Sequence, residues 1–191
     1  RERSFDGRAV TAGRGRLPTR LPGVSMIFQD AMTSLDPVWT VGSQFRAVLR
    51  GRRWSRRADT TEQAKQWLRR VGLMDVDRVL GARPYELSGG MRQRVMVALA
   101  LSTQPRLVIA DEPTSALDAM LSRGAMELLV GLTEEAGAAL LLVSHDIHLC
   151  REFTDRMMVM YAGRVVEQLA SADAAAACHP YTRGLISSVP E

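Results

Sequence analysis

Several features that mark particular protein classes are scarce in this 191-residue sequence. Its two cysteines, Cys150 and Cys178, are too few for a disulfide framework, so we expect reduced thiols in a cytosolic compartment. The longest apolar stretch, around residues 136–143, is far shorter than the roughly 20 residues of a membrane-spanning helix. No charged-then-apolar leader is visible, so no secretory signal is expected. A composition of 46% hydrophobic and 24% charged residues excludes a disordered tail or a collagen-like fibre.

Lysine is nearly absent, because Lys65 is the only lysine among 25 basic residues. The first 57 residues hold 12 arginines against four acidic residues, whereas the remainder is net acidic. The run Arg50–Arg57 mixes arginine with Trp54, a combination found at nucleic-acid interfaces. We favour a solvated helical face there, because one short cluster without a binding fold is weak evidence.

Short apolar runs of strand length alternate with helix-like segments along the chain. Strands are predicted over 24–28, 107–110, 140–143 and 157–161, the last forming a hairpin with 164–167. Helices are predicted over 41–49, 60–71 (with Asp59 or Thr60 as N-cap), 91–101 and 117–132, with a short one over 171–177. This alternation predicts an α/β fold whose mostly parallel strands are buried on both faces. Residues 41–85 lack strand-like runs and are interpreted as a helical insertion.

Polar residues that can do chemistry follow three of the predicted strands. Gln29 follows the first, Asp111 and Glu112 end the second, and Ser144 and His145 end the third. Because ligands of open α/β sheets bind outside the carboxyl ends of the strands, we expect these side chains to share one site. Neighbouring residues on a strand point in opposite directions, so Asp111 suits a Mg²⁺ ion and Glu112 suits a general base acting on water.

The sequence Ser88-Gly89-Gly90 precedes the predicted buried helix. Ser88 is a good N-cap, and the free N–H groups of a first helical turn attract anions. The two glycines allow a phosphate to approach the backbone closely. We therefore predict an anion site there, although such triplets are often only helix starts.

Together these segments resemble the ATP-binding subunit of ABC transporters over nearly the whole chain. Residues 87–94 (LSGGMRQR) resemble the signature motif, and residues 107–114 (LVIADEPT) resemble the Walker B strand. Residues 115–118 (SALD) resemble the D-loop, residues 144–146 (SHD) the switch histidine, and residues 28–30 (FQD) the Q-loop. The branch that imports peptides and nickel is suggested by residues 27–37 (IFQDAMTSLDP), by Met91, and by the tail HPYTRGL at 179–185.

The resemblance implies a P-loop NTPase-like α/β fold with a helical subdomain. It implies a division into a core portion with the Q-loop (1–40), the helical subdomain (41–86), the signature, Walker B, D-loop and switch-histidine core (87–169) and a peptide-importer tail (170–191). It implies ATP and Mg²⁺ as ligands, with the following sites: catalytic Glu112, His145 and Gln29; metal-binding Gln29 and Asp111; nucleotide-binding Ser88, Gly89, Gly90, Asp111 and Asp118. ATP is expected between the P-loop of one subunit and Ser88-Gly89-Gly90 of a second.

The implied partners are a second ATP-binding subunit, two membrane-spanning permease subunits and an extracytoplasmic solute-binding protein, with no nucleic acid. The implied location is the cytoplasmic face of the cell's inner membrane. Two alternatives stay open. One is a soluble ABC-type ATPase acting on nucleic acid or ribosomes, for which the arginine excess is the only argument. The other is a non-catalytic regulatory ABC module.

One departure from the family pattern is severe. The P-loop G-x-x-x-x-G-K-S/T holds the β- and γ-phosphates, but Lys65 follows Ala64, on a predicted helix. The 191 residues therefore contain no P-loop. We expect the sequence to begin just after the P-loop helix, as an N-terminally truncated chain that is inactive alone. A true pseudo-ATPase is the less favoured interpretation, because it would not need an intact Glu112 and His145.

Overall fold

The computed structural model describes residues 4–5, 8–9, 21–29, 34–49, 57–115 and 119–188. Near the N-terminus, the two-residue strands β1 (Ser4–Phe5) and β2 (Arg8–Ala9) pair antiparallel. No helix in the described ranges is long and apolar enough to cross a membrane. The arginine-rich run 50–56 lies outside the described residues.

The centre of the fold is a parallel sheet with the strand order β3-β4-β5. Its strands are β3 (Val24–Ile27), β4 (Leu107–Asp111) and β5 (Ala139–Val143). Ile27 lies opposite Ala110, which in turn lies opposite Leu142. The apolar runs of the sequence predicted these strands to within about a residue at each end, and the parallel pairing is confirmed.

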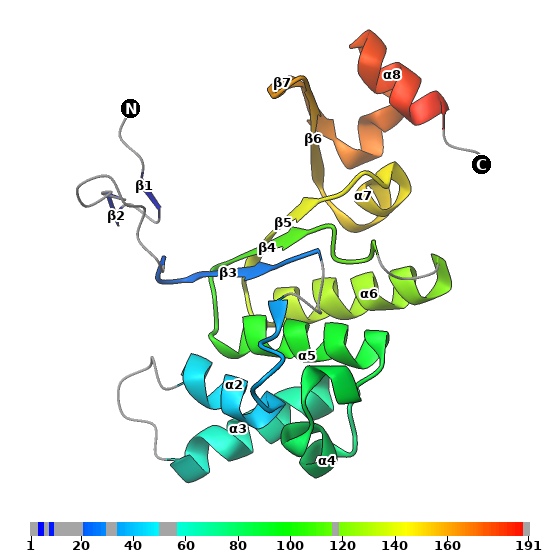
Figure 1. The fold of residues 1–191 in the computed structure, drawn as a ribbon. Coiled ribbons are helices and arrows are strands. Elements are labelled where there is room, and N and C mark those ends of the chain that lie inside the picture. Colours follow the sequence, from blue (N-terminus) through cyan, green and yellow to red (C-terminus); the bar gives the residue numbers. More distant parts are fainter. Residues whose placement is uncertain are drawn as a thin grey trace.

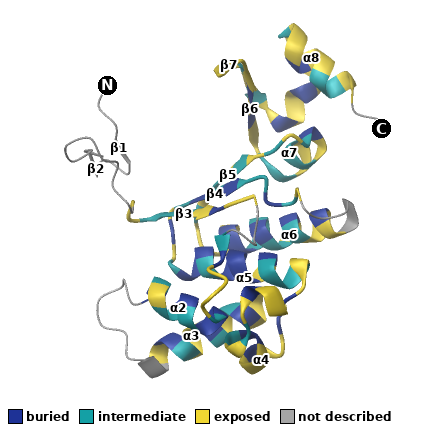
Figure 2. Cartoon of the chain, viewed as in Figure 1, coloured by how far each residue is buried: buried dark blue, intermediate teal, exposed yellow. Residues whose placement is uncertain are grey.

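Two long helices, α5 (Gly89–Ser102) and α6 (Ala119–Glu135), cover one face of this sheet (Figure 1). Alternate strand residues point to that face, and Ile27, Val108 and Ala110 are fully buried against it. The core continues through Leu101 of α5 and Leu129 of α6. The apolar segment 91–101 was predicted to be a buried helix, and α5 is buried along most of its length (Figure 2).

The opposite face of the sheet is not covered by the described residues. Met26, Leu141 and Val143 on that face are 41%, 39% and 47% exposed. The expectation that these strands are buried on both faces is therefore wrong for the described part of the chain. The apolar runs indicate strands that need cover on both sides, but they do not say which segment supplies it.

Helices and short loops, with no strand, make up the described parts of residues 41–86. The helices are α2 (Val41–Leu49), α3 (Arg57–Arg70), α4 (Val76–Gly81) and the 3₁₀ turn η1 (Pro84–Glu86). Helix α3 begins before Asp59, so the predicted N-cap at Asp59 or Thr60 is wrong. Asp59 stands instead in the first turn, where a carboxylate complements the helix dipole. Buried Ala64 and Leu68 of α3 join the main core.

The C-terminal part packs around a second, smaller core. It contains α7 (Ile147–Phe153), the predicted hairpin of β6 (Arg156–Tyr161) and β7 (Arg164–Ala170), the 3₁₀ helix η2 (Ser171–Ala176) and α8 (Pro180–Ser187). The predicted short helix is thus 3₁₀, and the segment expected to be a tail contains a helix. Glu167 of β7 accepts hydrogen bonds from the backbone N–H groups of Cys178 (2.6 Å) and His179 (3.2 Å), which fixes the entry to α8.

Candidate functional site

The carboxyl ends of the three parallel strands lie at one edge of the sheet. Asp111 ends β4 opposite Val143, the last residue of β5. Glu112 follows β4 directly, whereas His145 comes two residues after β5 and Gln29 two residues after β3. Parallel pairing therefore brings the backbone positions of Gln29, Asp111, Glu112 and His145 to the same edge.

Glu112 and His145 are in direct contact across this edge. Nδ1 of His145 lies 2.7 Å from Oε1 and 2.6 Å from Oε2 of Glu112. The hydrogen bond from Nδ1–H to the carboxylate, followed by the carboxylate's charge, raises the pKa of His145 above its ordinary value. The His145 side chain is 77% exposed and that of Glu112 only 21%, so Glu112 is fixed in the protein while the imidazole faces outward.

The backbone of Glu112 is strained. Its φ of +48° lies in the left-handed region, which costs a residue other than glycine about 1–2 kcal/mol. Its N–H donates to the carbonyl of Val143 (2.8 Å), and its own carbonyl accepts from the N–H of Ser115 (3.2 Å). This turn, residues 112–115 (the Glu112 turn), is also held by α5, because Nε2 of Gln93 donates to the carbonyl of Pro113. Strain of this kind persists only where surrounding contacts enforce it, and it is concentrated at functional sites.

Asp111 and Gln29 offer oxygen atoms of the kind that Mg²⁺ prefers. The Asp111 carboxylate is half-buried and has no hydrogen-bond or ion-pair partner in the described part of the chain. The Gln29 side chain is exposed and has none there either. These donors fit a hydrated Mg²⁺ ion with few protein ligands. Within the described ranges, no three or more His, Cys, Asp or Glu side chains gather as a metal cluster.

The Ser88-Gly89-Gly90 segment forms the N-terminus of α5. Ser88 is the N-cap, and its Oγ accepts from the N–H of Met91 (3.3 Å). A Cβ atom added to Gly90 would meet nothing within 4 Å, and one added to Gly89 would meet only the end of Arg92 at 3.9 Å. Neither glycine has a positive φ. The chain's own packing therefore does not require glycine here, although each glycine costs a helix about 1 kcal/mol relative to alanine.

The structure does not bring every predicted site residue together. No hydrogen bond or ion pair within the described residues joins Ser88, Gly89 or Gly90 to the Glu112–His145 pair. Asp118, predicted to bind nucleotide, lies outside the described residues, as do residues 30–33 of the predicted Q-loop. Helix α5 is the element that spans the two groups, since it begins at Gly89 and contacts the Glu112 turn through Gln93.

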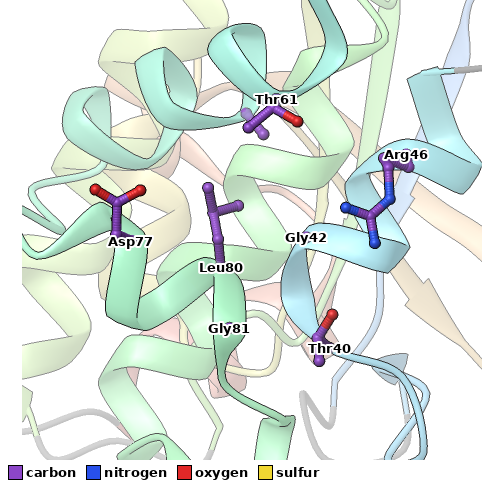
Figure 3. A pocket seen from close by; sticks show the side chains of 8 residues that line it. Thr40, Gly42, Arg46, Thr61, Asp77, Leu80 and Gly81 are labelled. Carbon is purple, nitrogen blue, oxygen red and sulfur yellow. The ribbon is translucent and has the colours of Figure 1, made fainter. Parts of the chain in front are cut away.

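A cavity of about 320 Å³ lies elsewhere, among α2, α3 and α4 (Figure 3). It is lined by Thr40, Gly42, Arg46, Thr61, Ala64, Asp77, Leu80 and Gly81. None of the predicted site residues is among them. The chemistry-bearing side chains thus lie at an open sheet edge and not in this cavity.

Gln93 is a residue whose contact the sequence analysis missed. It stands between Arg92 and Arg94, but its amide lies on the buried side of α5 and it is only 8% exposed. A buried amide needs a hydrogen-bond partner, and the helical spacing of Gln93 from the buried Met96 and Val97 was the available signal. The partner itself, the carbonyl of Pro113, is 20 residues away in sequence, so no local pattern identifies it.

Comparison with protein families gives a match between residues 3–115 and the family described as ABC transporter. A probable peptide ABC transporter ATP-binding protein (y4tR) of Sinorhizobium fredii is 46% identical over 169 residues, which are 88% of this chain and 50% of the relative. The oligopeptide transport ATP-binding protein AppD of Bacillus subtilis is 44% identical, over 87% of this chain and 51% of AppD. The dipeptide transport ATP-binding protein DppD of Escherichia coli is 43% identical, over 88% and 52%.

Solved structures give a concordant result. The chain is similar to cbiO1 of Clostridium perfringens, described as part of the ABC transporter complex cbiONQ, with a TM-score of 0.75 and 27% identity over 91% of this chain and 67% of cbiO1. It is also similar to the ATP-binding cassette MJ0796, solved as a dimer bound to ADP and Pi, with a TM-score of 0.66 and 30% identity over 78% of this chain and 62% of that one. The chain spans about half the length of the curated relatives it matches.

Proposed function

The chain belongs to the ABC transporter family, and from this premise we propose that it is part of an ATP-hydrolysing subunit that powers the import of peptides or related small solutes, nickel among them. The observation that carries the ATPase role is the contact between Glu112 and His145 at the sheet edge. The names of the relatives as peptide, oligopeptide and dipeptide transport proteins support the solute class.

Glu112 is the proposed general base. Its strained backbone and partly buried carboxylate give it one fixed orientation, as a base that activates a water molecule requires. His145 has its Nδ1–H bound to Glu112, which leaves Nε2 directed away from the pair, available to the γ-phosphate and the attacking water. The pair thus orients the attacking water, and it holds the proton that Glu112 removes from this water.

Asp111 and Gln29 would hold Mg²⁺ through their carboxylate and amide oxygens. When bound, Mg²⁺ neutralises charge on the β- and γ-phosphates during phosphoryl transfer. Ser88, Gly89 and Gly90 would contact the nucleotide of a second ATP-binding subunit, and Asp111 and Asp118 would also bind nucleotide. The support for Ser88-Gly89-Gly90 is a helix N-terminus whose glycines the chain's own packing does not require.

The proposed partners are the second ATP-binding subunit, two permease subunits and an extracytoplasmic solute-binding protein, at the cytoplasmic face of the inner membrane. One candidate surface for a permease lies beside the predicted Q-loop extension. Val38, Trp39 and Tyr85 are large, exposed and apolar there. Arg83 joins them, because its Nε donates to the carbonyl of Val38 (3.3 Å) and its Nη1 to the hydroxyl of Tyr85 (3.4 Å). Aromatic residues beside arginine are typical of protein interfaces.

The proposal is tested in proteoliposomes that contain the intact gene product and its permease subunits. Glu112→Gln should lower ATP hydrolysis by about 10²–10⁴-fold, because it removes the base without changing the shape of the side chain. ATP-driven uptake of a labelled peptide should fall with it. Glu134→Gln, at an exposed position of α6, is the matched control and should change neither rate. Hydrolysis by Glu112→Gln at the wild-type rate contradicts the base assignment, and hydrolysis without peptide or nickel uptake contradicts the importer role.

A further inference from the structure

Three consecutive polar residues of α5 each donate a hydrogen bond to a backbone carbonyl of a different segment. Nη1 of Arg92 reaches the loop before α5 (2.5 Å), Nε2 of Gln93 reaches the turn after β4, and Nη1 of Arg94 reaches the C-terminal end of α3 (3.3 Å). The acceptors are the carbonyl oxygens of Leu87, Pro113 and Val71. One turn of α5 thus contacts the segment before its own N-terminus, the helical region and the Glu112 turn.

Gln93 is the buried member of this group. Its neighbours on the helix, Val95, Met96 and Val97, are all buried in the main core. An amide in such surroundings is unfavourable unless it is hydrogen-bonded, so the Pro113 carbonyl accounts for the presence of glutamine at this position. Apolar packing alone would favour leucine or methionine there.

The carbonyl that Gln93 holds belongs to the residue directly after Glu112. Pro113 has no N–H group, so its carbonyl is the one backbone group through which the protein can hydrogen-bond this residue. The N–H of Ser115 closes the turn on the carbonyl of Glu112 (3.2 Å). On the far side of the turn, Oγ of Ser122 on α6 donates to the carbonyl of Thr114 (3.4 Å). The turn is therefore held from α5 and α6, beneath the sheet.

We propose that Gln93 is a positioning residue for the general base: by holding the Pro113 carbonyl, it keeps Glu112 in the left-handed conformation that directs its carboxylate to His145. The catalytic consequence rests on the function proposed above, whereas the link between α5 and the turn does not. Gln93 lies five residues after Ser88, about 7.5 Å along the helix. The helix that presents Ser88-Gly89-Gly90 to a second subunit therefore also holds the base of its own subunit.

The link is tested first in the intact gene product, with no ATP added, by amide hydrogen exchange. Gln93→Met keeps the length of the side chain and its packing but removes the donor. The N–H of Ser115 should then exchange about tenfold faster, the scale of one lost hydrogen bond. Gln93→Leu, which also lacks the donor and suits the apolar surroundings, serves if Gln93→Met does not fold.

Gln44 provides a matched control. It is also a buried glutamine, 9% exposed, and its Oε1 accepts from the N–H of Asp36 (3.1 Å) while Nε2 donates to the carbonyl of Asp36 (3.0 Å). Gln44→Met should speed exchange at Asp36 and leave Ser115 unchanged, and Gln93→Met should do the reverse. This crossed pattern separates a local effect from general destabilisation. Unchanged exchange at Ser115 in both Gln93 variants overturns the proposal.

The catalytic consequence is tested in the intact gene product without its permease. Gln93→Met should lower kcat for ATP hydrolysis by about 10- to 100-fold, because small displacements of a catalytic group have effects of this size. KM for ATP should stay within about twofold, since Gln93 does not contact the nucleotide. Faster exchange at Ser115 with an unchanged kcat overturns the positioning role. A wild-type protein that does not hydrolyse ATP contradicts the proposed function and leaves the exchange result intact.

Discussion

At the scale of single residues, the proposed chemistry depends on the contact between Glu112 and His145. Each residue follows a different strand, and their side chains meet because β4 and β5 are parallel neighbours that end in register. Glu112 reaches His145 from a left-handed backbone conformation that an ordinary residue rarely adopts. The geometry is therefore held against a local cost, which is the pattern expected of a functional residue.

The His145 titration tests this contact directly. The Glu112 carboxylate favours the imidazolium, so the pKa of His145 is raised, and Glu112→Gln should lower it towards its ordinary value. The contact should stabilise the fold fully below the unfolded-state pKa of the imidazole, and this contribution should disappear as the pH rises through the folded-state pKa. NMR titration of the His145 ring in both proteins measures the difference. Equal midpoints in the two proteins contradict the contact.

At the scale of elements, α5 begins with two residues that form helices poorly. No neighbouring atom lies close enough to Gly89 or Gly90 to exclude a Cβ atom. The N–H groups at this end that Ser88 does not cap are available to an anion. A helix N-terminus with free N–H groups and no side chain beyond the Ser88 cap fits a phosphate supplied from outside the subunit, which agrees with the proposed trans contact.

A dimerisation experiment tests the role of this helix end. Glu112→Gln should trap an ATP-bound dimer of the intact gene product, because hydrolysis is blocked while nucleotide binding is retained. Adding Ser88→Arg places a long charged side chain where the second subunit's ATP must approach, so the double variant should stay monomeric while each subunit still binds ATP. Size-exclusion chromatography with Mg-ATP compares the two. Equal dimerisation contradicts the trans role of Ser88-Gly89-Gly90.

At the scale of the whole molecule, the described chain combines a well-packed core with an open sheet face. Helices α5 and α6 bury one side of the sheet, whereas Met26, Leu141 and Val143 on the other side are exposed. The charge at the carboxyl edge of the sheet is also of one sign. Asp111 and Glu112 bring negative charge, and the sequence contains no P-loop lysine to hold the γ-phosphate.

We therefore expect the 191-residue chain alone neither to bind Mg-ATP tightly nor to hydrolyse it. Two carboxylates at the sheet edge repel a polyphosphate that has no lysine and no P-loop backbone to hold it. Isothermal titration calorimetry with Mg-ATP and a phosphate-release assay measure both properties. Sub-millimolar affinity with steady phosphate release contradicts the expectation.

The sequence by itself determined the strands, the parallel sheet and the edge at which the polar residues gather. Short apolar runs followed by Gln29, Asp111-Glu112 and His145 are local patterns, and parallel strands necessarily bring their carboxyl ends together. Hydrophobic periodicity also located α2 and α5 to within two residues at each end. The elements could be predicted because they depend on interactions between near neighbours in sequence, and the shared edge follows from parallel pairing once the strands are known.

Only the tertiary structure decided how the site is held. The left-handed φ of Glu112 is held by bonds to distant parts of the chain, from Glu112 to Val143 and from Gln93 to Pro113, and no local propensity encodes them. The expectation that both sheet faces are covered was wrong for the described residues, because an apolar run records the need for burial and not the partner that provides it. The start of α3 was misplaced for the related reason that helix ends depend on caps and on packing beyond the periodic pattern.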